Sequence, residues 1–205
     1  MLRQLFSPLH IDRKIATITI VSTLLLIVYS YHQVTPSDGL NQTILFLIIP
    51  LVFIVLVFRE SPRDYGLTLG DWRAGLVITL GGIILMTPVI WFLAKLDPSA
   101  QSYYQGMTAG LPWNTFFQIF GWEFLFRGWI LFGYARKFGA DALWLQAVPF
   151  ALMHISKPEI ETLSTIFGGF VFGWIAYRTR SFLYPFLIHW YIFTLIVLVA
   201  SGTIG

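Results

Sequence analysis

Apolar runs long enough to cross a lipid bilayer dominate this chain. A membrane-spanning helix needs about 17–25 predominantly apolar residues. Six runs reach this length, at 15–31, 40–58, 74–95, 113–133, 161–177 and 182–201. Because lipid offers no hydrogen-bond partner to an exposed backbone, such runs cross the membrane as helices packed in a bundle. The sequence therefore predicts an all-α, polytopic transmembrane helical bundle.

The composition supports the bilayer as the main solvent of the chain. Hydrophobic residues make up 57% and charged residues only 11%, whereas soluble domains carry about 25% charge. The chain has no cysteine, which excludes a disulfide framework, a thiolate metal site and a cysteine nucleophile. The small excess of basic residues is scattered rather than gathered on one face, so nucleic acid is not an expected partner, whereas membrane lipid is.

A shorter apolar segment at 141–155 brings the expected number of helices to about seven. Asp141 is placed to cap its start, and Lys157-Pro158 marks its end. A short segment is tolerated where it packs within a bundle or borders a water-filled cavity.

The distribution of Lys and Arg predicts the orientation of this bundle. With seven alternating segments, two basic residues, Lys95 and Lys157, fall on one side, and Arg127 lies within a span. The other side receives ten: Arg3, Arg13, Lys14, Arg59, Arg63, Arg73, Arg136, Lys137, Arg178 and Arg180. By the positive-inside rule, the N-terminus is expected in the cytoplasm and the C-terminus outside.

Ionisable residues at membrane depth are costly, about 2.5 kcal/mol or more each on insertion scales. Glu123 and Arg127 are four residues apart on one helix face and can form an ion pair. His154 ends the short segment and His189 lies within the last helix. At 1.5 Å per residue, Glu123 lies about 15 Å from the exterior end of its helix, and the two histidines about 20 and 11 Å from their cytoplasmic ends. All three are expected to meet inside the bundle.

Glu161 is a further candidate, because it follows His154 by seven residues across a Pro-marked turn. The first turn of a helix also favours a carboxylate without any catalytic role. A desolvated carboxylate with two imidazoles can activate water and stabilise an oxyanion, as amide hydrolysis requires. The same groups could instead hold Zn²⁺ with an open fourth position, although the His-Glu-x-x-His motif is absent.

These residues resemble the CPBP family of intramembrane proteases, which is named for CAAX and bacteriocin processing and is also called Abi. The family has three motifs on three core helices: Glu-Glu-x-x-x-Arg, Phe-x-x-x-His, and His-x-x-x-Asn or Asp. The corresponding segments here are Trp122-Glu123-x-x-x-Arg127, Phe150-x-x-x-His154 and His189-x-x-x-Phe193. The resemblance implies two N-terminal transmembrane helices in 1–59 and a CPBP-like core in 60–205, forming one membrane domain. It also implies a bacterial cell membrane setting and no cofactor, with zinc as the alternative.

Two positions depart from the family motifs. Trp122 replaces the glutamate normally assigned as the base, and Phe193 replaces the last asparagine. The family roles therefore transfer only to Arg127, His154 and His189, and the base is expected to be Glu123 or Glu161.

The leading functional hypothesis is an intramembrane endopeptidase that cleaves a peptide leader or the C-terminal sorting segment of a membrane-anchored protein. In this hypothesis a Glu activates water, His154 orients it and His189 lies in the oxyanion site. One alternative is a catalytically degenerate scaffold or a peptide-immunity protein. A small transporter is a further alternative, although the two related halves with broken helices that transporters often show are not found.

Overall fold

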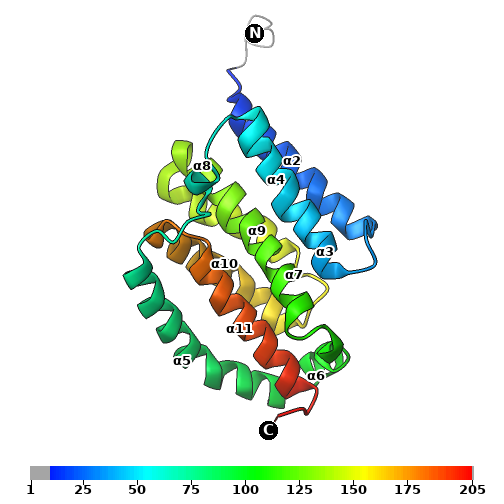
Figure 1. Ribbon diagram of the computed structural model, residues 1–205. Helices are drawn as coiled ribbons and strands as arrows, with labels where there is room; N and C mark the ends of the chain where they lie inside the picture. Colours follow the sequence, from blue (N-terminus) through cyan, green and yellow to red (C-terminus); the bar gives the residue numbers. More distant parts are fainter. Residues whose placement is uncertain (1–9, 205) are drawn as a thin grey trace, which may run out of the picture.

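The structure, a computed structural model, describes residues 10–204, and within this range the chain forms helices and no strand. Most helices run along the long axis of the molecule (Figure 1). The first is α2 (Arg13–Tyr31). A second, continuous helix follows, made of α3 (Asp38–Gln42), η1 (Thr43–Ile48), α4 (Ile49–Val52) and η2 (Phe53–Val57). The remaining main helices are α5 (Trp72–Leu96), α7 (Trp113–Glu123) continuing through η5 (Phe124–Ile130) into α8 (Leu131–Phe138), α9 (Ala142–Leu152), α10 (Glu159–Thr179) and α11 (Leu183–Ala200).

Five helices of the described chain are long and apolar enough to cross a membrane: Arg13–Tyr31, Asp38–Val57, Trp72–Leu96, Glu159–Thr179 and Leu183–Ala200. The continuous helix 113–138 and the short α9 supply the other two expected segments. The prediction of an all-helical, multi-pass membrane bundle is thus confirmed.

Three short elements lie in the connections between the long helices. They are η3 (Pro62–Tyr65), α6 (Pro98–Tyr104) and η4 (Thr108–Gly110). A further turn, η6 (Gly139–Asp141), precedes α9. The expected cap at Asp141 is wrong, because its side chain forms no capping hydrogen bond and the turn itself leads into the helix.

π-helical turns interrupt two of the long helices. Two of them, η1 and η2, lie in the second helix, and η5 lies in the middle of the helix 113–138. Such turns widen the helix locally and are frequent at functional sites. All seven residues of η5 are buried, Arg127 among them. The irregular backbone thus lies inside the bundle, where it is not exposed to lipid.

Close approach of the second helix to α7 shapes the interior near this turn. A Cβ atom on Gly121 would lie only 2.6 Å from the carbonyl oxygen of Gln42, so the two backbones touch at this glycine. Elsewhere α9 packs against α10, and α11 packs against α5 and α7. The interior is therefore enclosed by helices from both halves of the sequence.

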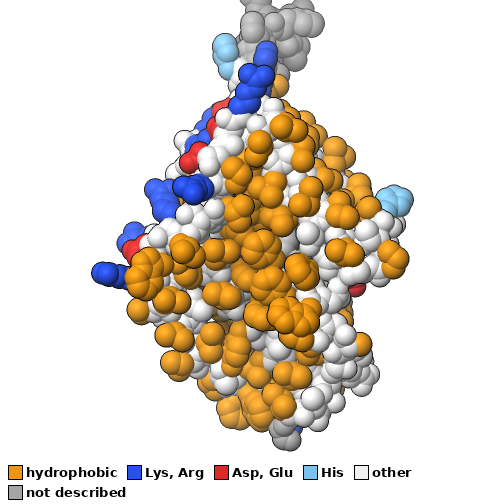
Figure 2. Space-filling view, in the orientation of Figure 1, with side chains coloured by type: hydrophobic (Ala, Val, Ile, Leu, Met, Phe, Trp, Pro, Cys, Tyr) orange, Lys and Arg blue, Asp and Glu red, His pale blue; other side chains and the backbone are white. Residues whose placement is uncertain are grey.

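The start of α2 and the end of α11 lie at opposite ends of the bundle (Figure 1). Charged side chains gather along the end where α2 begins, beside a broad apolar surface (Figure 2). Ion pairs join several of the predicted cytoplasmic residues there: Lys14 and Arg136 both pair with Glu60, and Lys137 pairs with Asp12. Arg3 lies outside the described residues. The side of the membrane that this end faces stays a prediction.

Candidate active site

Glu123 is the centre of a buried polar cluster. Its Oε1 accepts hydrogen bonds from Arg127 Nη1 at 3.1 Å and from His189 Nδ1 at 2.6 Å. Glu123 and Arg127 are fully buried, and His189 is 8% exposed. The expected i, i+4 ion pair within the helix is therefore present, and α11 brings His189 to the same carboxylate. A carboxylate oxygen can only accept, so His189 Nδ1 carries a proton, and in the neutral imidazole Nε2 is then the acceptor.

Aromatic rings surround Arg127 on its other sides. Its guanidinium carbon lies 3.9 Å from the centroid of the Phe150 ring and 5.3 Å from that of Phe172. The Nε and Nη2 atoms have no hydrogen-bond partner among the described residues. Arg127 is thus held by one carboxylate and by cation–π contacts, which makes it strongly dependent on Glu123 for charge compensation.

His154 lies just beyond the end of α9. Its Nδ1 is 2.7 Å from the carbonyl oxygen of Phe150, which can only accept, so Nδ1 donates and Nε2 is again the acceptor nitrogen. The carbonyl of His154 accepts from Thr162 Oγ1 at 2.5 Å, which ties the turn after α9 to α10. Phe150 contacts both imidazoles, with ring centroids 4.6 Å from His154 and 5.9 Å from His189.

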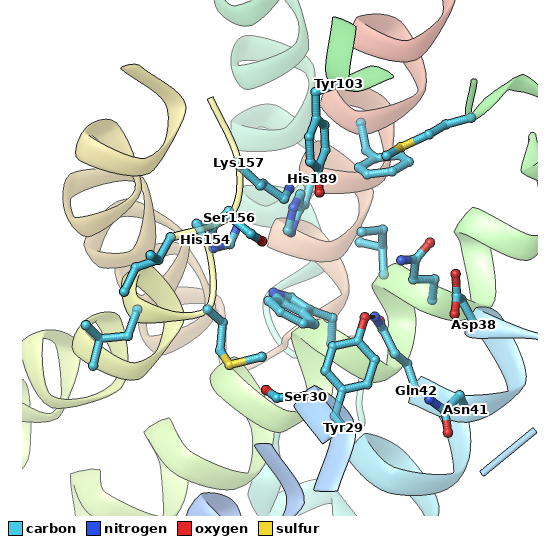
Figure 3. A pocket seen from close by; sticks show the side chains of 18 of the residues that line it. Tyr29, Ser30, Asp38, Asn41, Gln42, Tyr103, His154, Ser156, Lys157 and His189 are labelled. Atoms are coloured by element: carbon cyan, nitrogen blue, oxygen red, sulfur yellow. Dashed lines mark hydrogen bonds between the residues drawn. The ribbon is translucent and has the colours of Figure 1, made fainter. Parts of the chain in front are cut away.

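Two cavities open onto these histidines. The larger has about 490 Å³ and the smaller about 140 Å³. His154, Lys157, His189 and Phe193 line both. Figure 3 shows His154, Lys157 and His189 along one side of the larger cavity. Glu123 and Arg127 line neither cavity, so Glu123 contacts His189 from outside both cavities.

Glu161 occupies the first turn of α10, as expected, and lines the smaller cavity. Its partners are Lys157 Nζ, which donates at 2.9 Å, and Tyr104 OH, which donates at 2.6 Å. No hydrogen bond joins Glu161 to His154 in the described chain. The Lys157 pairing follows from the i, i+4 spacing, but Tyr104 lies 57 residues away in α6 and no local sequence signal marks it.

Aromatic side chains fill the two positions that depart from the family motifs. Trp122 lines the larger cavity and meets the His154 ring edge to face, with centroids 5.8 Å apart. Its Nε1 has no partner among the described residues. Phe193 packs against Tyr104, with centroids 5.9 Å apart, and lies 5.7 Å from Lys157 Nζ.

The opposite side of the larger cavity is polar and comes from the N-terminal helices (Figure 3). Gln42 is 1% exposed, its Nε2 donates to Tyr29 OH at 2.6 Å, and its Oε1 has no partner within residues 10–204. Asn41 and Asp38 also line this wall. Sequence reasoning missed these residues, since isolated amides near a helix start usually serve only as caps or in packing.

Potential metal ligands do not gather in the described part of the chain. Within residues 10–204, no group of three or more His, Asp or Glu side chains is arranged to hold a metal ion. The two histidines each use Nδ1 for a protein acceptor.

Residues 104–195 match the family model described as type II CAAX prenyl endopeptidase Rce1-like. No curated protein and no solved structure matches the chain. The matched segment contains Glu123, Arg127, His154, Glu161 and His189, and Tyr104 is its first residue.

Proposed function

We propose that the chain is an intramembrane endopeptidase for a peptide or membrane-anchored protein substrate, because residues 104–195 match the family model described as type II CAAX prenyl endopeptidase Rce1-like. One observation carries the proposal: His154 and His189 line one cavity, and a buried carboxylate holds His189. The expected substrates are a peptide leader or a C-terminal sorting segment.

His189 is the general base in this proposal. A water in the cavity transfers a proton to Nε2 of His189 while Nδ1–H remains bonded to Glu123. The water oxygen attacks the carbonyl carbon of the peptide, and the imidazolium then returns the proton to the leaving amine. Glu123 acts as a positioning residue here, because both donors converge on one of its oxygens and it lines neither cavity.

His154 and Lys157 complete the proposed chemistry. His154 Nε2 accepts a hydrogen bond from the attacking water and so orients it. The Lys157 ammonium, held by Glu161 at 2.9 Å, stabilises the oxyanion that forms on the carbonyl. Glu161 thereby acts through Lys157 rather than as the base. Arg127 pairs with the Glu123 carboxylate at 3.1 Å and lines neither cavity, so it acts through Glu123 and does not touch the substrate.

The larger cavity suits a peptide. Its volume of about 490 Å³ lies within the range of about 300–1,000 Å³ that is usual for ligand sites. Asp38 lines the cavity opposite the histidines and is exposed, so its carboxylate can accept from N–H groups of an extended peptide.

The test compares newly formed protein termini in membranes containing each variant. Wild type, His154→Ala, His189→Ala and the control His32→Ala are reconstituted with membrane proteins from cells lacking this protein, and termini are mapped by mass spectrometry. His32 is exposed and lies outside both cavities. Termini produced by wild type and by His32→Ala, and missing with the two site variants, are expected. An identical set from all four proteins contradicts the proposal.

A second candidate is a peptide-binding scaffold without catalysis. Trp122 and Phe193 favour it, since each places an aromatic ring where the family has a polar group. The variant Trp122→Glu separates the two functions. If wild type produces no new termini and Trp122→Glu does, the natural protein is the scaffold.

Metal dependence is tested by removing metal. We expect cleavage to survive dialysis against a strong chelator, since side chains alone supply every proposed step. Loss of cleavage after chelation and recovery with Zn²⁺ would make the histidines metal ligands instead.

Membrane orientation needs its own test. We propose a bacterial cell membrane location with a cytoplasmic N-terminus, supported by the charge gathering in Figure 2. Reporter fusions after Lys137 are expected on the cytoplasmic side, and fusions after Gly205 on the exterior side. Both on one side would overturn the seven-segment topology.

A further inference from the structure

Three arginines line a separate cavity at the charged end of the bundle. This cavity has about 470 Å³ and is lined by Arg63, Asp64, Phe132, Arg136 and Arg180. The arginines come from η3, from α8 and from the end of α10. Three guanidinium groups against one carboxylate leave two positive charges uncompensated on its walls. None of the candidate active-site residues lines it.

Only one of these arginines is compensated by a close protein carboxylate. Arg136 Nη1 lies 2.6 Å from Glu60 Oε1, and its Nη2 is 4.0 Å from Asp64. Within residues 10–204, the guanidinium groups of Arg63 and Arg180 form no ion pair. Their charges are therefore available to an anion that enters the cavity.

The backbone at Arg180 points to a role for its side chain. Arg180 ends α10 in the left-handed conformation, with φ 58° and ψ 27°. Glycine usually occupies such a helix end because it has no Cβ to clash. The positive-inside preference accounts for a basic residue at this end, and Arg178 already supplies one in helical backbone. The positive-inside preference does not explain why arginine stands at a position whose backbone favours glycine. Two arginines of the described chain have such a backbone, Arg59 with φ 56° and Arg180 with φ 58°, and of these Arg180 lines the cavity.

Hydrogen bonds hold the walls of the cavity together. Phe182 N donates to the Gly66 carbonyl at 3.2 Å, and Asp71 N donates to the Thr179 carbonyl at 2.8 Å. Tyr184 OH donates to the Leu69 carbonyl at 2.6 Å. The loop after η3 is thus fixed to the turn between α10 and α11, so the backbone positions of Arg63 and Arg180 are set before any ligand arrives.

Exposed apolar side chains flank Gly70, whose backbone lies against Arg180 of the charged cavity. Leu69 is 65% exposed and Trp72 is 52% exposed, and both belong to the segment bonded to the α10–α11 turn. An exposed tryptophan at a helix start is typical of the membrane interface. Figure 2 shows the apolar surface beginning where the charged side chains end.

We propose that this cavity binds the phosphate of an anionic phospholipid headgroup, with the acyl chains lying along the apolar surface beside it. Arginine is well suited to phosphate because its planar donors can bind two oxygens at once. The neighbouring apolar surface favours a lipid over free phosphate as the source of the anion.

Native mass spectrometry of the purified full chain tests this proposal. The protein is mixed with equal amounts of phosphatidylglycerol and phosphatidylcholine that carry identical acyl chains. Wild type is expected to retain phosphatidylglycerol preferentially. Because Arg63 and Arg180 line the cavity and a hydrogen bond from a charged group contributes about 1.5 kcal/mol or more, we expect Arg63→Gln and Arg180→Gly each to lower the preference about tenfold.

The control is Arg178→Gln, which removes the same charge two residues from Arg180 without touching the cavity. It is expected to leave the preference unchanged. Arg180→Gly also relieves the left-handed backbone, so its thermal midpoint should equal or exceed that of wild type, which separates lost binding from lost folding. An equal loss with Arg178→Gln, or no loss with Arg180→Gly, overturns the proposal. So does complete competition by inorganic phosphate, because the site would then take a soluble anion.

Discussion

Glu123 and Glu60 are both bonded to two basic side chains, yet they lie in very different surroundings. Glu123 accepts from Arg127 and His189 inside the bundle, where all three groups are 8% exposed or less. Glu60 accepts from Lys14 and from Arg136 at the charged end, and its side chain is 26% exposed. The same kind of ion pairing therefore occurs in the buried Glu123 cluster and in the partly solvent-exposed Glu60 cluster.

This difference in exposure determines how strongly each cluster depends on balanced charge. In the interior, a charge that loses its partner cannot be solvated, so removing one member is far more costly than the pair is worth. At the charged end, water can partly replace the missing partner, so the same change costs less than in the interior. The buried Glu123 cluster is therefore the better suited of the two to hold an imidazole, that of His189, in one position for catalysis.

The largest expected effect is that of Glu123→Gln. The neutral amide leaves Arg127 as an unpaired buried charge, which costs about 3–5 kcal/mol and should sharply lower the amount of folded protein. Folded protein in detergent is measured by size-exclusion chromatography and thermal unfolding. The double variant Glu123→Gln with Arg127→Met removes both charges and is expected to recover much of the folded protein. No recovery would show that Arg127 does more than balance Glu123.

Glu123→Asp separates positioning from stability. It keeps the charge that Arg127 requires but shortens the reach to His189 Nδ1, now 2.6 Å. We expect near-normal amounts of folded protein with strongly reduced formation of new termini. Full cleavage by folded Glu123→Asp would show that Glu123 does not position His189.

Features set by residues close together in the sequence could be predicted, whereas contacts between distant segments could be predicted only in part. The helices followed from apolar runs, and the Glu123–Arg127 pair from a spacing of four within one helix. The contact between Glu123 and His189 was expected, because both lie at a similar depth in the membrane. The hydrogen bond between Tyr104 and Glu161 was not predicted. The turn η5 was invisible, because a π-helical turn has the same apolar composition as an ordinary helix.

Glu60→Gln is expected to have a smaller effect, which depends on pH. Partial burial raises the pKa of Glu60, but hydrogen bonds from Lys14 and Tyr65 and the charge of Arg136 outweigh it, so the pKa is below the ordinary 4.5. A lowered folded pKa stabilises the protein above the ordinary value, and this contribution is lost as pH falls through the folded pKa.

Thermal midpoints from pH 7 down to pH 3 check this expectation. Near neutral pH, Glu60→Gln should cost about 1.5–3 kcal/mol, the usual contribution of hydrogen bonds to a charged group. Below the folded pKa the variant and wild type should converge. A constant difference at every pH would mean that Glu60 acts through packing rather than through its charge.

Tyr104→Phe tests a site between these extremes. The side chains of Glu161 and Lys157 are 18% and 16% exposed, and Tyr104 OH donates to Glu161 at 2.6 Å. Removing the hydroxyl should cost about 1 kcal/mol, since Lys157 still compensates the carboxylate. Cleavage should persist with a modest decrease, because Lys157 keeps its partner. Complete loss of cleavage in folded Tyr104→Phe would place the phenol itself in the reaction.

The smallest expected effect is that of Lys137→Gln at the charged end. Lys137 Nζ lies 3.2 Å from Asp12 Oδ2, but the two side chains are 47% and 37% exposed. Water and salt screen such a pair, and holding two long side chains in place offsets most of the attraction. Asp12 also keeps its hydrogen bonds to the backbone N–H groups of Lys14 and Ile15 at 3.1 Å, so the start of α2 remains capped. The thermal midpoint should be unchanged in low and high salt. A decrease that disappears in high salt would show that exposed pairs at this end do stabilise the bundle, and the contrast between Glu60 and Glu123 would then be one of degree.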